Sequence, residues 1–178
     1  MMENPTLQFC PLQPEDWPAV SAIYQQGIDT GNATFAEKAP STWEEWIHGK
    51  LERCRLVARL DGKTVAWAVL TPVSTRAVYR GVAELSIYVA DEARGRGVGA
   101  ALLEALIHDS EEQDIWMLEA LVFPENTASM QLHLKQGFKL LGVRQRLGYM
   151  TFGPYAGHWR DVALLERRSQ VAGMWIGK

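Results

Sequence analysis

The sequence predicts a single mixed α/β domain in which a central, mainly antiparallel sheet carries helices on both faces. Its 178 residues are close to the roughly 150 that one domain contains, and 47% apolar with 22% charged residues is typical of a globular chain. A strand hairpin precedes two strand-to-helix units, which differs from the regular alternation of a doubly wound sheet. We therefore expect one domain over residues 1–178, with a core at about 7–167 and a tail at 168–178.

The chain opens with a short strand and two helices. Residues 7–10 predict the strand, and residues 14–27 predict an amphipathic helix that begins at a proline. The hydroxyl of Ser41 can cap a second helix, and Glu44 three residues later can close a capping box. We expect this second helix to end before Arg53.

An antiparallel hairpin and a third strand follow. Residues 55–60 and 64–70 are apolar, β-branched runs that flank Asp61-Gly62, the dipeptide that best suits the positive φ angles of a tight turn. After a loop, residues 82–89 predict a long strand.

Strands and helices then alternate to the end of the chain. In order we expect a helix at residues 97–108, a strand at 116–122, a helix at 126–135, a strand from 138 and a strand at 161–165. Gly137 can end the 126–135 helix in a left-handed conformation. Residues 170–178 carry no clear pattern.

Composition excludes several classes of function. A net charge of −3 and a pI near 5.8 provide no basic field for nucleic acid. Cys10 and Cys54 are far apart and have no histidine neighbours at ligand spacing, which indicates neither a disulfide framework nor a metal site. No apolar run approaches the roughly 18 residues of a membrane span. We expect a cytoplasmic protein without nucleic-acid or membrane partners.

The most specific segment is a glycine-rich turn between the 82–89 strand and the next helix. Its six residues are Arg94, Gly95, Arg96, Gly97, Val98 and Gly99. Glycines let backbone N–H groups face a ligand, and the helix start adds partial positive charge, so the turn can hold phosphate oxygens. Neither Lys nor Ser or Thr follows the last glycine, which excludes a P-loop.

A dinucleotide-binding fingerprint is the alternative interpretation of this turn. Gly95-x-Gly97-x-x-Ala100 matches its Gly/Ala variant, and Glu119 lies about 20 residues further on. Against it, residues 91–94 separate the strand from the first glycine, Glu119 falls inside a strand, and the unit lies in mid-chain after a hairpin. A nicotinamide oxidoreductase is therefore the weaker hypothesis.

Read as Arg94-x-x-Gly97-x-Gly99, the turn resembles the acetyl-CoA motif of the GCN5-related N-acetyltransferases (GNAT family). A second segment is similar to the family's later helix-to-strand unit: Asn126, Ser129, Leu132, His133, Gly137 and Phe138. Residues 77–89 and the motif Gly157-His158-Trp159-x-Asp161-Val162 further resemble the phosphinothricin and methionine sulfoximine acetyltransferase subgroup. The resemblance covers residues 7–167.

This resemblance implies the GNAT-like acyl-CoA N-acyltransferase fold, in which the sheet splays between the 82–89 and 116–122 strands and admits the pantetheine arm. It implies acetyl-CoA as co-substrate, no metal, and a small primary amine of amino-acid type as acceptor. Together with an apolar face on the first helix and the 149–165 region, it implies a homodimer. The implied cofactor-binding residues are Ile87, Tyr88, Val89, Arg94, Gly95, Arg96, Gly97, Val98, Gly99, Asn126 and Ser129.

Two residues are candidates for proton transfer. Glu84 lies within an apolar strand on the same face as Ser86 and Tyr88, where burial would raise its pKa toward that of a useful general base. His133 occupies the position of a family tyrosine that protonates the leaving thiolate. The alternatives are an ion pair for Glu84 with Arg80 or another cation, and simple packing for His133.

The resemblance also implies acceptor-binding residues: Thr34, Phe35, Ser74, Thr75, Arg80 and Leu85. The arginine suits the carboxylate of an amino acid analogue, with ordinary surface exposure as its alternative. Asn126 can equally serve as a helix N-cap. An amine N-acetyltransferase is thus the leading hypothesis, and an acetyl-CoA sensor without catalytic activity remains open beside it.

Overall fold

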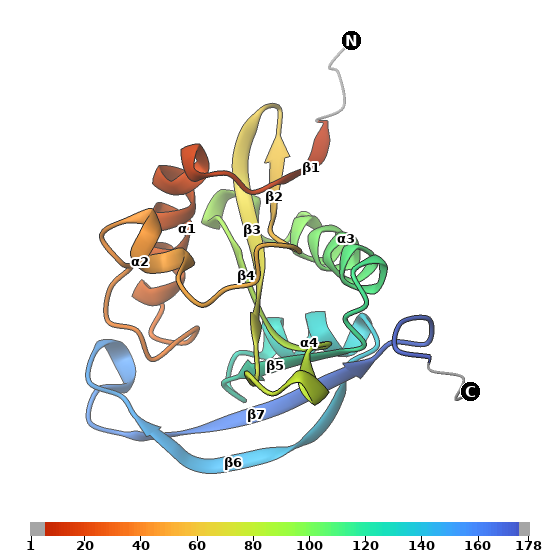
Figure 1. The fold of residues 1–178 in the computed structure, drawn as a ribbon. Coiled ribbons are helices and arrows are strands. Elements are labelled where there is room, and N and C mark those ends of the chain that lie inside the picture. The colour runs from red at the N-terminus through yellow and green to blue at the C-terminus, as the bar shows by residue number, and fades with distance from the viewer. Residues whose placement is uncertain (1–5, 175–178) are drawn as a thin grey trace.

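The computed structural model describes residues 6–174 and builds one seven-stranded sheet within that range (Figure 1). The strands are β1 (Leu7–Pro11), β2 (Leu56–Leu60), β3 (Lys63–Pro72), β4 (Val82–Val89), β5 (Met117–Val122), β6 (Lys139–Tyr149) and β7 (Trp159–Arg168). Their order across the sheet is β1-β2-β3-β4-β5-β7-β6, and β4–β5 is the one parallel pair. The mixed, mainly antiparallel sheet is confirmed, and the doubly wound sheet of the dinucleotide hypothesis is excluded.

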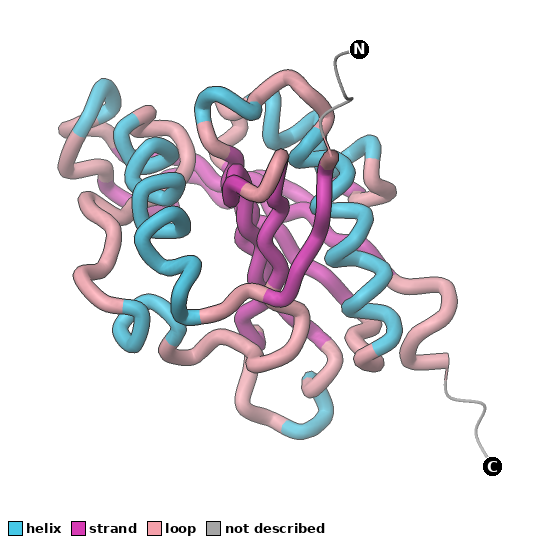
Figure 2. The backbone as a smooth tube through the Cα atoms, turned by 90° about the horizontal axis from the view of Figure 1, so that it is seen from above, coloured by secondary structure: helices cyan, strands magenta, loops and turns pink. Residues whose placement is uncertain are grey.

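Helices cover both faces of this sheet (Figure 2). They are α1 (Trp17–Asp29), α2 (Trp43–Ile47), α3 (Val98–Glu112) and α4 (Thr127–Lys135), with single 3₁₀ turns at Pro14–Asp16, Ala77–Tyr79, Asp91–Ala93 and Gly153–Tyr155. α1 and α2 lie on one side of β2–β4 and α3 lies on the other (Figure 1). α4 adjoins α3, since the side chain of Gln136 donates to the Ala100 carbonyl at 3.3 Å. The ends of the predicted domain, 1–5 and 175–178, lie outside the described residues.

The core on the α1 face is aromatic. Trp67 of β3 is 1% exposed, stacks on Tyr88 of β4 at 4.6 Å and meets Trp46 of α2 edge-on at 5.0 Å. Tyr24 of α1 contacts both Trp67 and Tyr88. The apolar residues of α1 are used in this core, so they are not free to form a dimer contact.

The prediction of the second helix, capped by Ser41 and ending before Arg53, was wrong about both its N-cap and its length. α2 spans only Trp43–Ile47, and its N-cap is Thr42, whose hydroxyl accepts from the Glu45 amide at 3.2 Å. Ser41 and Thr42 are adjacent, and so are Glu44 and Glu45, so the pairs Ser41–Glu44 and Thr42–Glu45 have the same spacing. The sequence alone therefore does not tell which hydroxyl caps the helix. The helix stops early because Gly49 adopts a left-handed φ of 75°.

The sheet opens between β4 and β5. These strands pair only through residues 82–84 of β4 and 117–119 of β5. Beyond Glu84, β4 remains paired with β3, and β5 remains paired with β7, but the two strands no longer pair with each other. The predicted splay is confirmed, and it leaves one edge of residues 85–89 available to a ligand.

β6 and β7 form a long arm that bends away from the rest of the sheet (Figure 1). β7 is longer than the predicted 161–165 strand at both ends. The β6–β7 register shifts between Arg144 and Gly148, where Arg146 has a φ of 50°. No helix within residues 6–174 has the length and apolar character needed to cross a membrane. That range also contains no cluster of three His, Cys, Asp or Glu side chains arranged to hold a metal.

Candidate active site

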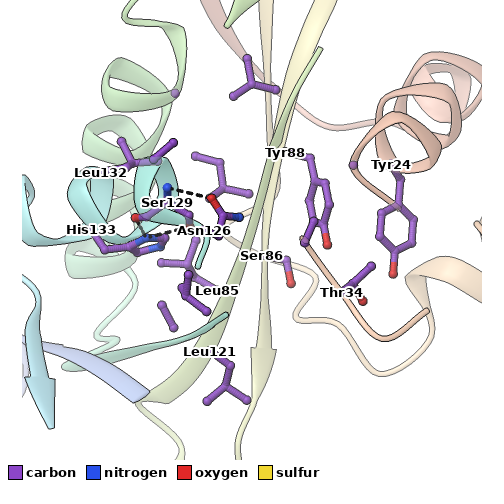
Figure 3. Close-up of a pocket in the computed structure, with 18 of the residues that line it drawn as sticks. Tyr24, Thr34, Leu85, Ser86, Tyr88, Leu121, Asn126, Ser129, Leu132 and His133 are labelled. Carbon is purple, nitrogen blue, oxygen red and sulfur yellow. Dashed lines mark hydrogen bonds between the residues drawn. The ribbon is translucent and has the colours of Figure 1, made fainter. Parts of the chain in front are cut away.

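A cleft of about 940 Å³ begins where β4 and β5 separate. Its walls come from α1 and the loop after it, from β4, from the glycine turn, and from the end of β5 and α4. This volume falls at the upper end of the usual range for small-molecule sites. Figure 3 shows Tyr24, Thr34, Ser86 and Tyr88 on the α1 side of β4, whereas Asn126, Ser129, Leu132 and His133 lie on the α4 side.

The glycine turn has the geometry of an anion-binding site. Gly95 and Gly97 have φ angles of 72° and 80°, and Gly97 is the N-cap of α3. A Cβ at either glycine would meet no atom within 4 Å, so the left-handed backbone, not crowding, requires glycine there. The start of α3, residues 97–100, lines the cleft, so the N–H groups of this first turn give the cleft partial positive charge.

The two arginines of the turn differ. Arg94 pairs with Asp91 at 2.8 Å, and its Nε donates to the Val89 carbonyl at 3.2 Å. Arg94 lines the cleft together with Gly95, Gly97, Val98 and Gly99, whereas Arg96 does not belong to the lining found within residues 6–174.

Glu84 lies at the last paired position of β4, directly beside Glu119 of β5. Burial raises the pKa of the Glu84 carboxyl above its ordinary value, and the negative charge of Glu119 raises it further. None of the ion pairs found between described residues includes Glu84, and its side chain lines the cleft. The arrangement is that of a carboxylate with increased basicity.

His133 lines the opposite wall and is 2% exposed. Its Nδ1 lies 2.7 Å from the Ser129 carbonyl, which can only accept, so this contact assigns the proton to Nδ1. Nε2 is buried without a hydrogen-bond partner among residues 6–174. Burial lowers the pKa of the imidazole, although the Ser129 carbonyl opposes this shift, so the neutral form prevails at neutral pH.

Asn126 and Ser129 hold α4 in place at the cleft. The Asn126 side chain caps the helix by accepting from the Ser129 amide at 3.1 Å, and its Nδ2 donates to the Asn32 carbonyl at 3.0 Å. Sequence identified this cap but not the contact with the loop after α1. On β4, Ile87 and Val89 line the cleft with both Ser86 and Tyr88.

The α1 side of the cleft carries hydroxyl groups. Burial raises the pKa of Tyr88, the neighbouring Tyr24 adds to this shift, and a hydrogen bond with Thr34 opposes it. Burial likewise raises the pKa of Tyr24. Both phenols therefore stay protonated and can donate hydrogen bonds. Tyr24 and Ser86 line the cleft but were not predicted as site residues, because Tyr24 has the spacing of a core residue and Ser86 that of an ordinary strand position.

The predicted acceptor residues divide into two groups. Thr34, Phe35 and Leu85 line the cleft, and Phe35 packs edge-on against Phe123 at 4.9 Å. The second group consists of Ser74, Thr75 and Arg80. Within the described chain it falls outside the cleft lining, and the Arg80 guanidinium lies over the Trp116 ring at 5.1 Å and pairs with Asp114 at 3.9 Å.

Comparison with known proteins agrees with this geometry. Residues 15–138 match the acetyltransferase (GNAT) family. The chain is 36% identical over 163 residues to phosphinothricin N-acetyltransferase of Alcaligenes faecalis, covering 86% of this chain and 78% of that one. It is 26% identical over 156 residues to an L-methionine sulfoximine/L-methionine sulfone acetyltransferase of Pseudomonas paraeruginosa, covering 85% and 88%.

A solved structure extends the likeness to the whole fold. The phosphinothricin acetyltransferase of Sinorhizobium meliloti, determined in complex with AcCoA, superposes with a TM-score of 0.82 at 26% identity, covering 97% of this chain and 94% of that one. The family match, the relatives and the open β4–β5 edge agree. This chain therefore belongs to the acetyltransferase (GNAT) family and is an acetyl-CoA-dependent N-acetyltransferase.

Proposed function

We propose that this enzyme acetylates the primary amine of a small amino-acid-like substrate of the phosphinothricin or methionine sulfoximine type. The observation that carries the proposal is the position of Glu84, a carboxylate of raised pKa at the point where β4 and β5 separate. The names of the Alcaligenes faecalis and Pseudomonas paraeruginosa relatives support this substrate class. Both this substrate class and the identity of the acceptor within it belong to the proposal.

β4 leads from its unpaired edge at residues 87–89 into the glycine turn, and acetyl-CoA would bind to both. The amides of the turn, from Arg94 and Gly95 through Gly99, would hold its phosphates, with Arg96 at the rim. The free edge of Ile87, Tyr88 and Val89 would pair with the pantetheine amides, since this stretch has no partner on β5. Bound there, the thioester supplies the activated acyl group, while Asn126 and Ser129 hold the α4 wall.

Glu84 takes the proton of the acceptor amine, directly or through one water molecule, because an ammonium ion has no lone pair with which to attack. Glu84 alternates along β4 with Ser86 and Tyr88, so its side chain shares their face. Figure 3 shows Ser86 and Tyr88 on the α1 side of β4, so the amine enters from that side. A backbone N–H in residues 87–89 stabilises the negative charge that develops on the carbonyl oxygen.

His133 is the proposed proton donor to the leaving thiolate. Its lowered pKa makes the imidazolium form a minority at neutral pH, which limits what the side chain can contribute. The step needs little help because a thiolate is already a good leaving group. We therefore assign the larger catalytic effect to Glu84.

The acceptor itself would be held by residues at two depths. Thr34, Phe35 and Leu85 line the cleft and would contact the body of the substrate. Ser74, Thr75 and Arg80 stand near the start of β4, and the arginine would meet a distal carboxylate after moving from Trp116.

Thiol release from acetyl-CoA, measured with a panel of amino acid analogues, polyamines and peptide N-termini, tests the proposal. We expect turnover with the amino acid analogues, and Glu84→Gln should reduce it by roughly 10²-fold or more, as expected of a general base. The loss should shrink as pH rises and free amine becomes available. Glu104→Gln is the control for loss of a carboxylate, because Glu104 is exposed on α3 and does not belong to the cleft lining. Preference for another amine class would contradict the substrate assignment, and full turnover by Glu84→Gln at pH 6 to 9 would contradict the mechanism.

We also propose that the enzyme is a cytoplasmic homodimer whose contact involves the β6–β7 arm. β6 is an edge strand, and its side chains are largely exposed. The arm is the part of the described chain in which large apolar side chains concentrate at the surface.

A further inference from the structure

Arg160, near the start of β7, is a buried cation that belongs to none of the groups described so far. Its side chain is 2% exposed. Nη1 donates to the Gly31 carbonyl at 3.0 Å, and Nη2 donates to the Asn32 side-chain oxygen at 2.8 Å. Nη2 also pairs with the Glu125 carboxylate at 3.1 Å, which lies just before α4. The guanidinium of this β7 residue thus connects β7 both to the loop after α1 and to the loop after β5.

Two aromatic rings enclose this guanidinium. Its Cζ lies 3.9 Å from the centroid of Phe123 and 3.7 Å from that of Tyr155. Phe123 in turn packs edge-on against Phe35, a cleft residue. A planar guanidinium can stack on two rings while its edge makes hydrogen bonds, which an ammonium cannot do.

Hydrogen bonds continue from Arg160 to the opposite wall of the cleft. The Asn32 carbonyl accepts from Asn126 Nδ2 at 3.0 Å, and Asn126 Oδ1 accepts from the Ser129 amide at 3.1 Å. The Ser129 carbonyl then accepts from His133 Nδ1 at 2.7 Å. The segment 31–35 and α4 are therefore held together through one connected set of contacts.

We infer that Arg160 is a positioning residue for the acceptor amine, because it fixes residues 31–35 against the N-terminal end of α4. This inference rests on the proposed function, in which Thr34 and Phe35 contact the acceptor. A buried charge is a poor choice for stability alone, since apolar residues of similar volume often serve as well. The guanidinium Nε is also buried without a hydrogen-bond partner among residues 6–174. Arg160 is better explained by the geometry it imposes on the cleft.

Three variants test the inference. Arg160→Met removes the fork and the charge but keeps an unbranched apolar stem, and Glu125 stays solvated because its side chain is 48% exposed. Arg160→Lys keeps only the charge. Arg167→Met is the matched control, because it removes a part-buried arginine of β7 that pairs with Glu111 of α3 at 2.8 Å and does not belong to the cleft lining.

We expect Arg160→Met to lower kcat/KM for the acceptor roughly 10-fold to 100-fold through KM, as small misplacements of binding groups do. The KM for acetyl-CoA should stay within about 3-fold, since the hydrogen bonds and ring contacts of Arg160 go to residues 31, 32, 123, 125 and 155 and not to the turn or β4. Arg160→Lys should not restore the acceptor KM, because an ammonium group can neither make the paired hydrogen bonds of the guanidinium nor stack between the Phe123 and Tyr155 rings. Arg167→Met should change thermal stability without changing either KM.

Hydrogen exchange of residues 31–35 provides a readout that needs no activity. Exchange there should be about 10-fold faster in Arg160→Met than in wild type or Arg167→Met. Unchanged exchange would overturn the inference, and so would faster exchange with an unchanged acceptor KM. If wild type acetylates no amine of the panel, the proposed function fails, and exchange still decides whether Arg160 holds the segment. Should Arg160→Met not fold, Asn32→Ala takes its place with the same expectations, because it removes the Asn32 side-chain oxygen that accepts from Arg160 Nη2.

Discussion

At the scale of single residues, the candidate base belongs to a row of side chains that crosses the sheet. Thr71 of β3, Glu84 of β4, Glu119 of β5, Glu166 of β7 and Lys139 of β6 are successive register partners. Register partners share one face, so three carboxylates follow one another and a lysine ends the row. The negative charge of Glu119 favours a bound proton on Glu84, which is the member of the row that lines the cleft.

Glu119→Gln should lower the pKa of Glu84. The negative charge of Glu119 raises that pKa, so removing it leaves only burial to do so. A base must be deprotonated to act, and the acidic limb of the kcat/KM profile should therefore move to lower pH. The groups that face Glu84 are Glu119, Tyr88 and the hydroxyl of Thr71, and Glu119 is the one whose negative charge acts on the Glu84 carboxyl. A pH–rate profile with an unmoved acidic limb would show that Glu84 is not the titrating base.

His133→Phe should reduce turnover less than Glu84→Gln does, by roughly 10-fold, because thiolate protonation needs little assistance. Because the pKa of the His133 imidazole is lowered, the imidazolium form is populated mainly at low pH. The difference in turnover between His133→Phe and wild type should therefore be largest at low pH. His108→Phe, whose side chain is 75% exposed on α3, is the control. Equal losses from His133→Phe and Glu84→Gln would reverse the ranking of the two residues.

Single residues also mark the limits of sequence analysis. Glu84 was identified because an acid in an apolar strand is conspicuous in sequence. Arg160 was not, since its partners come from residues 31–32, 123–125 and 155, which only the folded chain brings together. No local pattern signals a side chain whose contacts are all distant.

At the scale of elements, periodicity predicted strands and helices well wherever packing follows one face. β4 was predicted with its observed bounds, and the hairpin of β2 and β3 turns at Asp61 and Gly62 with left-handed φ angles. The length of α2 was not predictable, because a left-handed Gly49 ends it before the apolar pattern does. β7 was predicted too short, as 161–165, because its end residues Trp159 and Arg168 are exposed and the apolar pattern stops before the pairing with β5 and β6 does.

Gly97→Val should raise the KM for acetyl-CoA. The valine side chain meets open space, so any effect comes from the left-handed φ of 80° and from blocking the amide cradle. Gly62→Val separates these causes, because Gly62 has the same φ of 80° and equally open surroundings but lies in the β2–β3 turn. We expect both variants to lose thermal stability and only Gly97→Val to change KM. A similar KM change in both would assign the effect to general loss of structure.

At the scale of the whole molecule, the two halves have different surfaces. The strands β2–β4 lie between α1 and α3, whereas the arm ends in the edge strand β6 and has apolar side chains in solvent. Leu141 is 55% exposed and Trp159 is 58% exposed. An uncovered edge strand with apolar side chains is a recognised site of association. Because Arg160 and Gly148 lie on the same arm, with Gly148 against the Phe35 ring, association there would also stiffen the acceptor side.

Leu141→Arg should therefore separate the proposed homodimer. Sedimentation at micromolar concentration should give twice the 20.0 kDa chain mass for wild type and the chain mass itself for the variant, since a buried unpaired charge at an interface is strongly unfavourable. Val171→Arg, at a position 68% exposed outside the arm, should stay dimeric. A wild-type protein that sediments only at 20.0 kDa would refute the dimer. If the arm also stiffens the cleft through Gly148 and Arg160, Leu141→Arg should raise the acceptor KM while leaving that for acetyl-CoA unchanged, which links assembly to substrate binding and not to the cofactor turn.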